Sequence, residues 1–392
     1  MAASQATEHC AHSAVAALPD SLWTALDDAA RFDATVRASP GDRPRLLACY
    51  VAPMPYGRDR LFARMLAGEP SILTGFPIPA RGSVGGLPPD RAGAAIVDWL
   101  AARRSPAPHR VATGPASPRR TLSLREFAVK WRDGSEPLGI TDLHIRGTRM
   151  EEIIDPDGLS AFNLLRRSTA GAKRQEMFSL VIGTRGYMTD SHSDDPDSSN
   201  YCFTGRKLWL SWDTYEGIEH GLEDVERMTV AGRARFDLAT WLSLPSARWF
   251  LVGHGETLFL PAHLTHKVIT LEPYVGVGGF FIALPNCLRL FAHWLARGPL
   301  WSKRDATGEN DGLLGDIAAA TRQTVLALRT APASERMRWG YDHLNRSARA
   351  FIASCPADRF RLLWSDPRFR MVAETIRASW PLPASHPLRF EL

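Results

Sequence analysis

The chain has 392 residues, of which 45% are hydrophobic and 23% are charged, values that are typical of a soluble globular protein with a sizeable core. Its net charge of +5 is spread out, with only short basic stretches at residues 102–110 and 117–120, which argues against a nucleic-acid-binding protein. The five cysteines are scattered and include no C-x-x-C pair, so a zinc or iron–sulfur cage is not indicated and a reducing compartment is favoured.

Membrane and export signals are also lacking in the sequence. No apolar run approaches the roughly 20 residues of a membrane span, and no basic segment followed by an apolar one opens the chain. We therefore expect a cytoplasmic protein with no membrane partner. At this length, a catalytic core with additional segments is expected.

Helix signals dominate the first third of the chain. A polar, alanine-rich tail precedes residues 18–37, where apolar residues recur at helical spacing and Asp20 or Ser21 is a suitable N-cap. Further helices are expected at residues 58–66, 96–103 and 123–131, the last with Ser123 as its N-cap.

The middle of the chain contains short β-like runs separated by turn signals. This density predicts a closed or sandwiched antiparallel sheet. The expected strands cover residues 138–145, 178–182, 208–212, 249–252, 257–260, 266–271 and 274–284. A short helix begun by Asp237 is expected at residues 238–242.

From residue 287 onward the periodicity becomes helical. Helices are expected at residues 288–295, 313–328, 334–353 and 369–379. The apolar stripe of the second one, from Leu314 to Leu328, is expected to form core or a subunit contact, and a homodimer through these helices is one possible arrangement.

Two H-x-[DE] triplets stand out as possible metal-binding pairs: His192-Ser193-Asp194 and His254-Gly255-Glu256. With 12 histidines, about one such triplet is expected by chance. We prefer the first because it follows an apolar β-like run, and residues i and i+2 of a strand share a face. Glycines flank His254 and indicate a solvated turn.

A third ligand is expected from a downstream strand. His263 and His266 are three residues apart, so on a strand they would face opposite sides, and His266 opens the apolar run KVITL. Two histidines and one carboxylate leave the opposite metal positions open, an arrangement typical of non-haem Fe(II) oxygenases.

Such an oxygenase needs an electron source, and 2-oxoglutarate would require a cation for its distal carboxylate. Lys207 follows Gly205 and precedes an apolar run, which favours an inward orientation, and a buried lysine needs an anionic partner. Thr189 and Asn200 are candidates for further hydrogen bonds to this co-substrate.

Three segments together resemble the JmjC-domain, cupin-type Fe(II)- and 2-oxoglutarate-dependent oxygenases. LVIGTRGYMTDSHSD (residues 180–194) is similar to the strand with the first two ligands. GRKLW (205–209) is similar to the lysine element, and GETLFLPAHLTH (255–266) to the segment with the last histidine. The resemblance covers about residues 60 to 285. The sequence departs from the family at residues 262–265, where Ala, His, Leu and Thr replace the usual aromatic residues.

The resemblance implies a mainly β core, a double-stranded β-helix of the cupin or jelly-roll type, with flanking helices and an α-helical C-terminal extension. The expected regions are an N-terminal tail and helix (1–59), the JmjC-like catalytic domain (60–286) and a helical region (287–392). Fe(II) would bind His192, Asp194 and His266.

The resemblance also implies that 2-oxoglutarate would reach Lys207, Thr189 and Asn200. O₂ would convert it to succinate and CO₂ while a C–H bond is hydroxylated in an amino acid, a peptide or protein side chain, or a small natural product. The alternatives are a non-catalytic cupin-fold binding or regulatory protein, a metal-dependent cupin of other chemistry, and a JmjC-type N-demethylase. Apart from Asp194, the acidic segment at residues 194–199 is expected to be a solvated loop.

Overall fold

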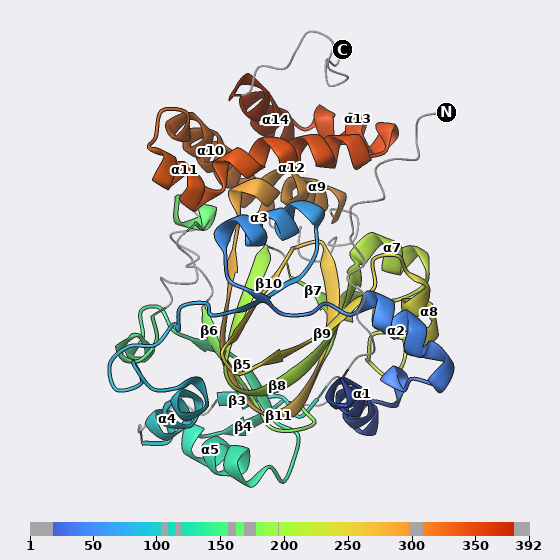
Figure 1. The fold of residues 1–392 in the computed structure, drawn as a ribbon, viewed down its shortest axis with the longest axis vertical. Coiled ribbons are helices and arrows are strands. Elements are labelled where there is room, and N and C mark those ends of the chain that lie inside the picture. The colour runs from blue at the N-terminus through green and yellow to red at the C-terminus, as the bar shows by residue number, and fades with distance from the viewer. Residues whose placement is uncertain are drawn as a thin grey trace.

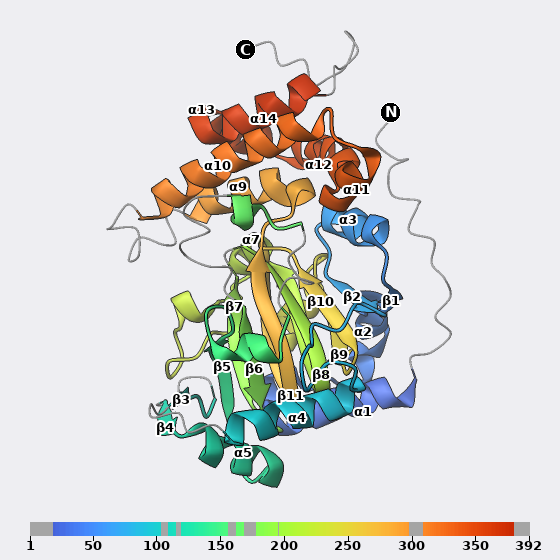
Figure 2. The same ribbon diagram turned by 90° about the vertical axis from the view of Figure 1, so that its left-hand side faces the viewer.

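The computed structural model describes residues 19–102, 109–114, 119–155, 162–167, 178–194, 196–297 and 309–379. A nine-stranded mixed sheet lies at the centre of these residues, with helices at both of its ends and along one side (Figures 1 and 2). A separate antiparallel pair is formed by β3 (His109–Val111) and β4 (Arg120–Leu122).

The sheet is antiparallel except for its first pair of strands. Its main path runs β1-β2-β10-β8-β11-β6-β5; β7 also pairs with β11, and β9 with β8. The bounds are β1 Met54–Pro55, β2 Ser71–Thr74, β5 Gly139–His144, β6 Ser179–Gly183, β7 Met188–Ser193, β8 Asp197–Asp213, β9 Arg248–Gly253, β10 Glu256–Leu260 and β11 Leu264–Phe281.

Two long strands, β8 and β11, each pair with one neighbouring strand along their first part and with another along their second part. β11 pairs first with β7 and then with β6, and β8 pairs first with β10 and then with β9. Three register shifts between Thr270 and Gly276 bend β11. Beside them, Gly205 of β8 adopts φ 84°, and a Cβ at Gly205 would lie 2.2 Å from the carbonyl oxygen of Pro273.

These long strands correct the sequence prediction. Residues 266–271 and 274–284 were expected to be separate strands, but one 18-residue strand crosses the exposed Glu272 and Pro273 by means of bulges. The strand expected at 208–212 is the end of the 17-residue β8. The sheet curls around one apolar cluster with members from both halves, including Trp209, Leu258 and Val268.

The N-terminal helices cover the outer face of β8, β9 and β11. α1 (Asp20–Phe32) and α2 (Arg43–Cys49) pack there together with α8 (Leu238–Ser243), which begins with an N-cap hydrogen bond to Asp237 as predicted. α1 buries Leu26 and Ala29, the face expected from its periodicity, but its N-cap is Pro19 and not Asp20 or Ser21 as predicted. This layer therefore lies behind the strands that carry His192 and His266.

At one end of the sheet lie α4 (Pro89–Ala102) and α5 (Leu124–Asp133) (Figure 1). Ser123 caps α5 in a capping box with Glu126, as the sequence indicated. α7 (Thr214–Glu219) follows β8 directly.

At the opposite end, the C-terminal helices and α3 (Arg58–Ala67) cover the strands (Figures 1 and 2). The helices are α9 (Cys287–Arg297), α10 (Glu309–Leu328), α11 (Ala333–Trp339), α12 (Tyr341–Ser354), α13 (Ala357–Ser365) and α14 (Pro367–Ser379). The prediction of a single helix at 334–353 was wrong, because Gly340 (φ 64°) ends α11 and α12 begins after it. The stripe on α10 is buried as core, and one hydrophobic cluster joins this helical region to the sheet.

Among the described residues, we find no helix with both the length and the apolar character required for crossing a membrane.

Candidate metal centre

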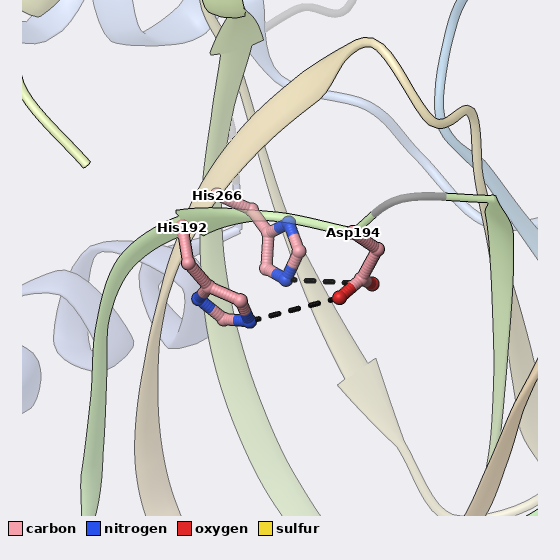
Figure 3. A group of neighbouring side chains, drawn as sticks. All are labelled: His192, Asp194 and His266. Atoms are coloured by element: carbon pink, nitrogen blue, oxygen red, sulfur yellow. Dashed lines mark ion pairs between the residues drawn. The ribbon is translucent and has the colours of Figure 1, made fainter. Parts of the chain in front are cut away.

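Two histidines and one aspartate meet at the end of β7. The antiparallel register places His192 of β7 directly opposite His266 of β11, so both side chains lie on the same face. Asp194 is the first residue after β7, and its carboxylate points toward both rings (Figure 3). The fold thus brings together the three residues that the sequence predicted as metal ligands.

The spacing of these side chains suits one ion. Their ligand atoms lie within 4.8 Å of one another, and within the described ranges this is the sole group of three such residues. Nε2 of His192 is 3.9 Å from Oδ1 of Asp194, and Nε2 of His266 is 4.0 Å from Oδ2. Metal–ligand bonds of about 2.0–2.2 Å fit between atoms at these separations. His266 is buried, and the other two residues are half-buried.

Both histidine rings are held by backbone carbonyl groups. Nδ1 of His192 is 2.8 Å from the carbonyl oxygen of Asp190, and Nδ1 of His266 is 3.4 Å from that of Leu264. Because a carbonyl oxygen accepts, Nδ1 of each ring is the donor, and Nε2, on the side of Asp194, is the atom placed to bind a metal ion.

The electrostatics of His266 also favour metal binding. Burial, followed by the neighbouring His192, lowers the pKa of His266 to about 3. The ring is therefore neutral near pH 7, and a neutral imidazole is the form that binds a metal ion.

A buried ion cluster lies on the opposite face of the same two strands. Lys267, next to His266, has its Nζ 2.9 Å from Oδ2 of Asp33 and 3.1 Å from Oδ1 of Asp190. Asp190 also accepts hydrogen bonds from the backbone N–H groups of Ser191 and Ala234. β7 has one extra residue here, and the cluster therefore fixes the bulge whose carbonyl group orients His192.

Lys207 lies on the inner face, farther from the metal ligands. Its Cα pairs with Thr270, four residues along β11 from His266, or about 13 Å. The side chain is 3% exposed, and Nζ lies 4.1 Å from the ring centroid of Tyr274. Among the described residues no carboxylate lies within ion-pair distance of Lys207. Burial lowers the pKa of this amine to about 8.

Asn200 and Lys207 both contact Tyr274, a residue that the sequence analysis did not identify. The hydroxyl of Tyr274 donates a hydrogen bond to Oδ1 of Asn200, while its ring contacts Lys207. Tyr274 is far from both residues in the sequence, and it follows Glu272 and Pro273, which resemble the end of a strand. Its position next to Lys207 and Asn200 follows only from the bend of the continuous strand β11. Thr189 is half-buried on β7 and pairs with Val268, between the levels of His266 and Lys207.

Trp209 is a second residue that the motif comparison did not single out as functional. It pairs with Val268 from the β8 side, and its ring centroid lies 5.2 Å from that of His266. Its indole Nε1 is buried and has no hydrogen-bond partner among the residues that the structure describes. This donor lies on the inner face between the metal ligands and Lys207.

The competing triplet does not form a metal site among the described residues. His254 is exposed on the turn between β9 and β10, and Glu256 accepts a hydrogen bond from the N–H of Gly253. His263 lies in the turn before β11 and takes no part in the metal group.

The expectation of a solvated acidic loop was wrong for Asp197. This residue begins β8 and is completely buried. It accepts hydrogen bonds from the backbone N–H groups of Ala262 and Ala283 and from the side chain of Asn286. Burial raises its pKa to about 6 despite these donors. Asp195 lies outside the described residues.

Comparisons with protein-family models and with curated proteins find no match for this chain.

Proposed function

We propose that this protein is an Fe(II)- and 2-oxoglutarate-dependent oxygenase that hydroxylates a C–H bond of an amino acid, a peptidyl side chain or a small natural product. The metal would bind His192, Asp194 and His266. The observation that carries the proposal is the combination of this three-residue group with a buried lysine that has no carboxylate partner in the described part of the chain, both on one face of the curled sheet.

The donor chemistry of the site fits iron. Two imidazoles and one carboxylate bound on one side of an ion leave its other positions for exogenous ligands. Nitrogen and oxygen donors also suit other divalent metals, so the choice of iron depends on which co-substrate binds in the same site. Lys207 supplies that argument, because a buried ammonium group with no protein anion is stabilised by a bound carboxylate.

The fold is compatible with the proposed double-stranded β-helix. Long antiparallel strands that change neighbours at bulges allow one sheet to fold into two facing halves. β8 and β11 have this property, and the metal group lies where β7 joins β11.

Each residue has a defined part in this proposal. Bound iron with 2-oxoglutarate and O₂ supplies the oxidising power for hydroxylation, with succinate and CO₂ as co-products. The carbonyl groups of Asp190 and Leu264 hold the two imidazoles with Nε2 available. Lys207 would hold the distal carboxylate of 2-oxoglutarate, with Asn200, Thr189 and the indole N–H of Trp209 as further polar contacts. The apolar side chains around Trp209 would exclude water.

The test is direct. The purified protein with Fe(II) and 2-oxoglutarate under anaerobic conditions should show a metal-to-ligand charge-transfer band, and addition of O₂ should yield succinate. His192→Ala should abolish both signals. His254→Ala is the matched control, because it removes the histidine of the competing triplet and should change neither.

Metal binding also has a thermodynamic signature that is independent of turnover. A ligand that binds only the folded state at 100 times its Kd raises the free energy of unfolding by about 2.7 kcal/mol. We expect a gain of this size for wild type and no gain for His192→Ala. Absence of the absorption band and of any succinate in wild type would refute the oxygenase proposal, and formaldehyde release would indicate N-demethylation instead.

A further inference from the structure

A cleft of about 330 Å³ lies between the C-terminal helices and the ends of the strands. Residues of α9, α12 and α13 form one wall, and the end of α3 together with β8, β9 and the start of β11 forms the other. The volume corresponds to a small molecule or a single side chain and is at the lower limit of small-molecule pockets.

Positive charge dominates the lining of this cleft. It contains the guanidinium groups of Arg248, Arg289 and Arg359 but only two carboxylates, Glu69 and Asp213. Glu69 is shared between Arg248 and Arg64, and Asp213 caps α7 by accepting hydrogen bonds from two backbone N–H groups. Within the described residues, neither Arg289 nor Arg359 has a carboxylate at ion-pair distance. Asp213 acts on both guanidinium groups only from beyond ion-pair distance, so N–H donors of Arg289 and Arg359 remain for an anionic occupant.

Arg289 is held in place by the backbone of the facing wall. It donates one hydrogen bond, of 3.1 Å, to the carbonyl oxygen of Leu66. It also lies against Gly68, where a Cβ would be 1.8 Å from its Nη1. Because Gly68 adopts φ 71° and ends α3, the same glycine terminates the helix and makes room for the guanidinium group. Arg289 has further N–H donors, since a guanidinium group carries five.

His263 adds an unsatisfied polar atom to the same wall. Its Nδ1 is buried and has no hydrogen-bond partner in the described residues, and such atoms in native proteins call for an explanation. Arg359 extends from the other side and stacks over the ring of Tyr215, at 4.8 Å from its centroid. The cleft thus combines planar cationic groups, an aromatic ring and an unpaired imidazole nitrogen.

The cleft is also close to the candidate metal centre. Leu264, part of its lining, is two residues before His266 on β11, about 7 Å along the strand. The carbonyl group of Leu264 is the one that faces Nδ1 of His266. A molecule in the cleft would therefore lie against the segment that orients a metal ligand.

We propose that this cleft binds a small organic acid and that Arg289 and Arg359 hold its carboxylate or phosphate group. Guanidinium groups match both anions through paired N–H donors. We further propose that this acid is the molecule to be hydroxylated. This second part rests on the proposed function, whereas anion binding by the cleft does not.

The experiment measures anion binding to the metal-free protein by calorimetry, with inorganic phosphate and glutarate as separate probes. At least one probe should bind, and the preferred one identifies the anionic group. Arg359→Gln should weaken that binding about tenfold or more, as expected for the loss of a charge-assisted contact. Arg361→Gln is the matched control: it removes the same charge two residues along α13, at an exposed position outside the cleft, and should leave binding within about twofold.

Three outcomes would overturn the proposal: no binding of either probe, equal loss in both arginine variants, or loss in Lys207→Met with none in Arg359→Gln. The third would assign the anion to Lys207 instead. Proximity to the metal ligands is tested separately with Mn²⁺, which should enhance the ³¹P or ¹H relaxation of the bound probe. If Mn²⁺ does not bind but the anion does, the proposed function fails and the anion site remains.

Discussion

Two buried lysines among the described residues have opposite surroundings. Lys207 and Lys267 are each 3% exposed and lie on the neighbouring strands β8 and β11. Lys267, on the outer face, contacts the carboxylates of Asp33 and Asp190. Lys207, on the inner face, lies against the ring of Tyr274 and has no carboxylate at ion-pair distance in the described residues.

This difference separates a charge that the fold itself compensates from one that, under the proposed function, a bound anion would compensate. Burial of a charged group is costly unless an opposite charge and hydrogen bonds compensate. The outer cluster supplies its own compensation: burial alone would raise the pKa of Asp33, but Lys267 and the hydrogen bonds from Thr35 outweigh it and lower that pKa. The inner lysine keeps an uncompensated cost, which a bound anion would remove.

The largest expected effect is on stability, in Lys267→Met. The substitution leaves Asp33 and Asp190 buried without their cation, and breaking a buried ion pair in this way typically costs about 3–5 kcal/mol. The free energy of unfolding, measured by urea denaturation, should fall by that amount. Lys130→Met is the control, because it breaks a half-exposed pair with Glu136 and should cost less than about 1 kcal/mol. Equal losses in the two variants would show that the cluster does not act as a buried ion pair.

Lys207→Met should have the opposite effect from Lys267→Met: it should leave stability intact and weaken ligand binding. Removing an uncompensated buried amine should leave the free energy of unfolding unchanged or higher, because no carboxylate loses its partner. The affinity for 2-oxoglutarate should fall on the order of 30-fold or more, the range for truncating one member of a buried charge pair. Titration of the anaerobic Fe(II) protein with 2-oxoglutarate measures it. Unchanged affinity would remove Lys207 from the proposed site.

The pH dependence of stability offers a third comparison. The pKa of Lys207 is about 8 in the folded protein, below its ordinary 10.5. Between these values the unfolded chain binds a proton that the folded chain does not, so the free energy of unfolding rises with pH. Relative to that of Lys207→Met, the free energy of unfolding of wild type should rise by about 2 kcal/mol between about pH 7.5 and about pH 9.5.

A saturating anion at Lys207 should suppress this gain, because it keeps the amine charged. Urea denaturation at several pH values, with and without metal and 2-oxoglutarate, would measure both effects. A difference between the two proteins that stays constant with pH would show that Lys207 has an ordinary pKa and therefore an anionic neighbour already.

The contrast between the lysines also shows what the sequence can predict. The strand-like run before His192, the apolar segment after His266 and their alternation were sufficient to predict which three residues lie together. Local signals likewise predicted the N-caps at Ser123 and Asp237. The choice of these residues depends on a few neighbouring residues, whereas the contact between His266 and His192 is made by the pairing of β7 and β11.

Partners of buried polar groups that come from distant parts of the sequence could not be predicted in the same way. Asp33 lies far from Lys267 in the sequence, and nothing around it marks it as the partner of a buried lysine. Asp197 stands in an acidic stretch that reads as solvated, yet tertiary hydrogen bonds bury it. Tyr274 follows Glu272 and Pro273, which conceal the continuity of β11. In each case the environment is assembled from distant elements.

The smallest expected effect concerns Thr189, whose hydroxyl lies on the inner side of β7 level with Val268. Thr189→Val keeps the branched shape and removes one neutral hydrogen-bonding group, worth about 1 kcal/mol. We therefore expect about fivefold weaker binding of 2-oxoglutarate with unchanged stability, measured by the same titration. Thr189→Ser retains the hydroxyl and should bind as wild type does. If both variants bind normally while Lys207→Met does not, the co-substrate is held from the β8 side alone, and the anionic contact at Lys207 is separable from the strand that carries the metal ligands.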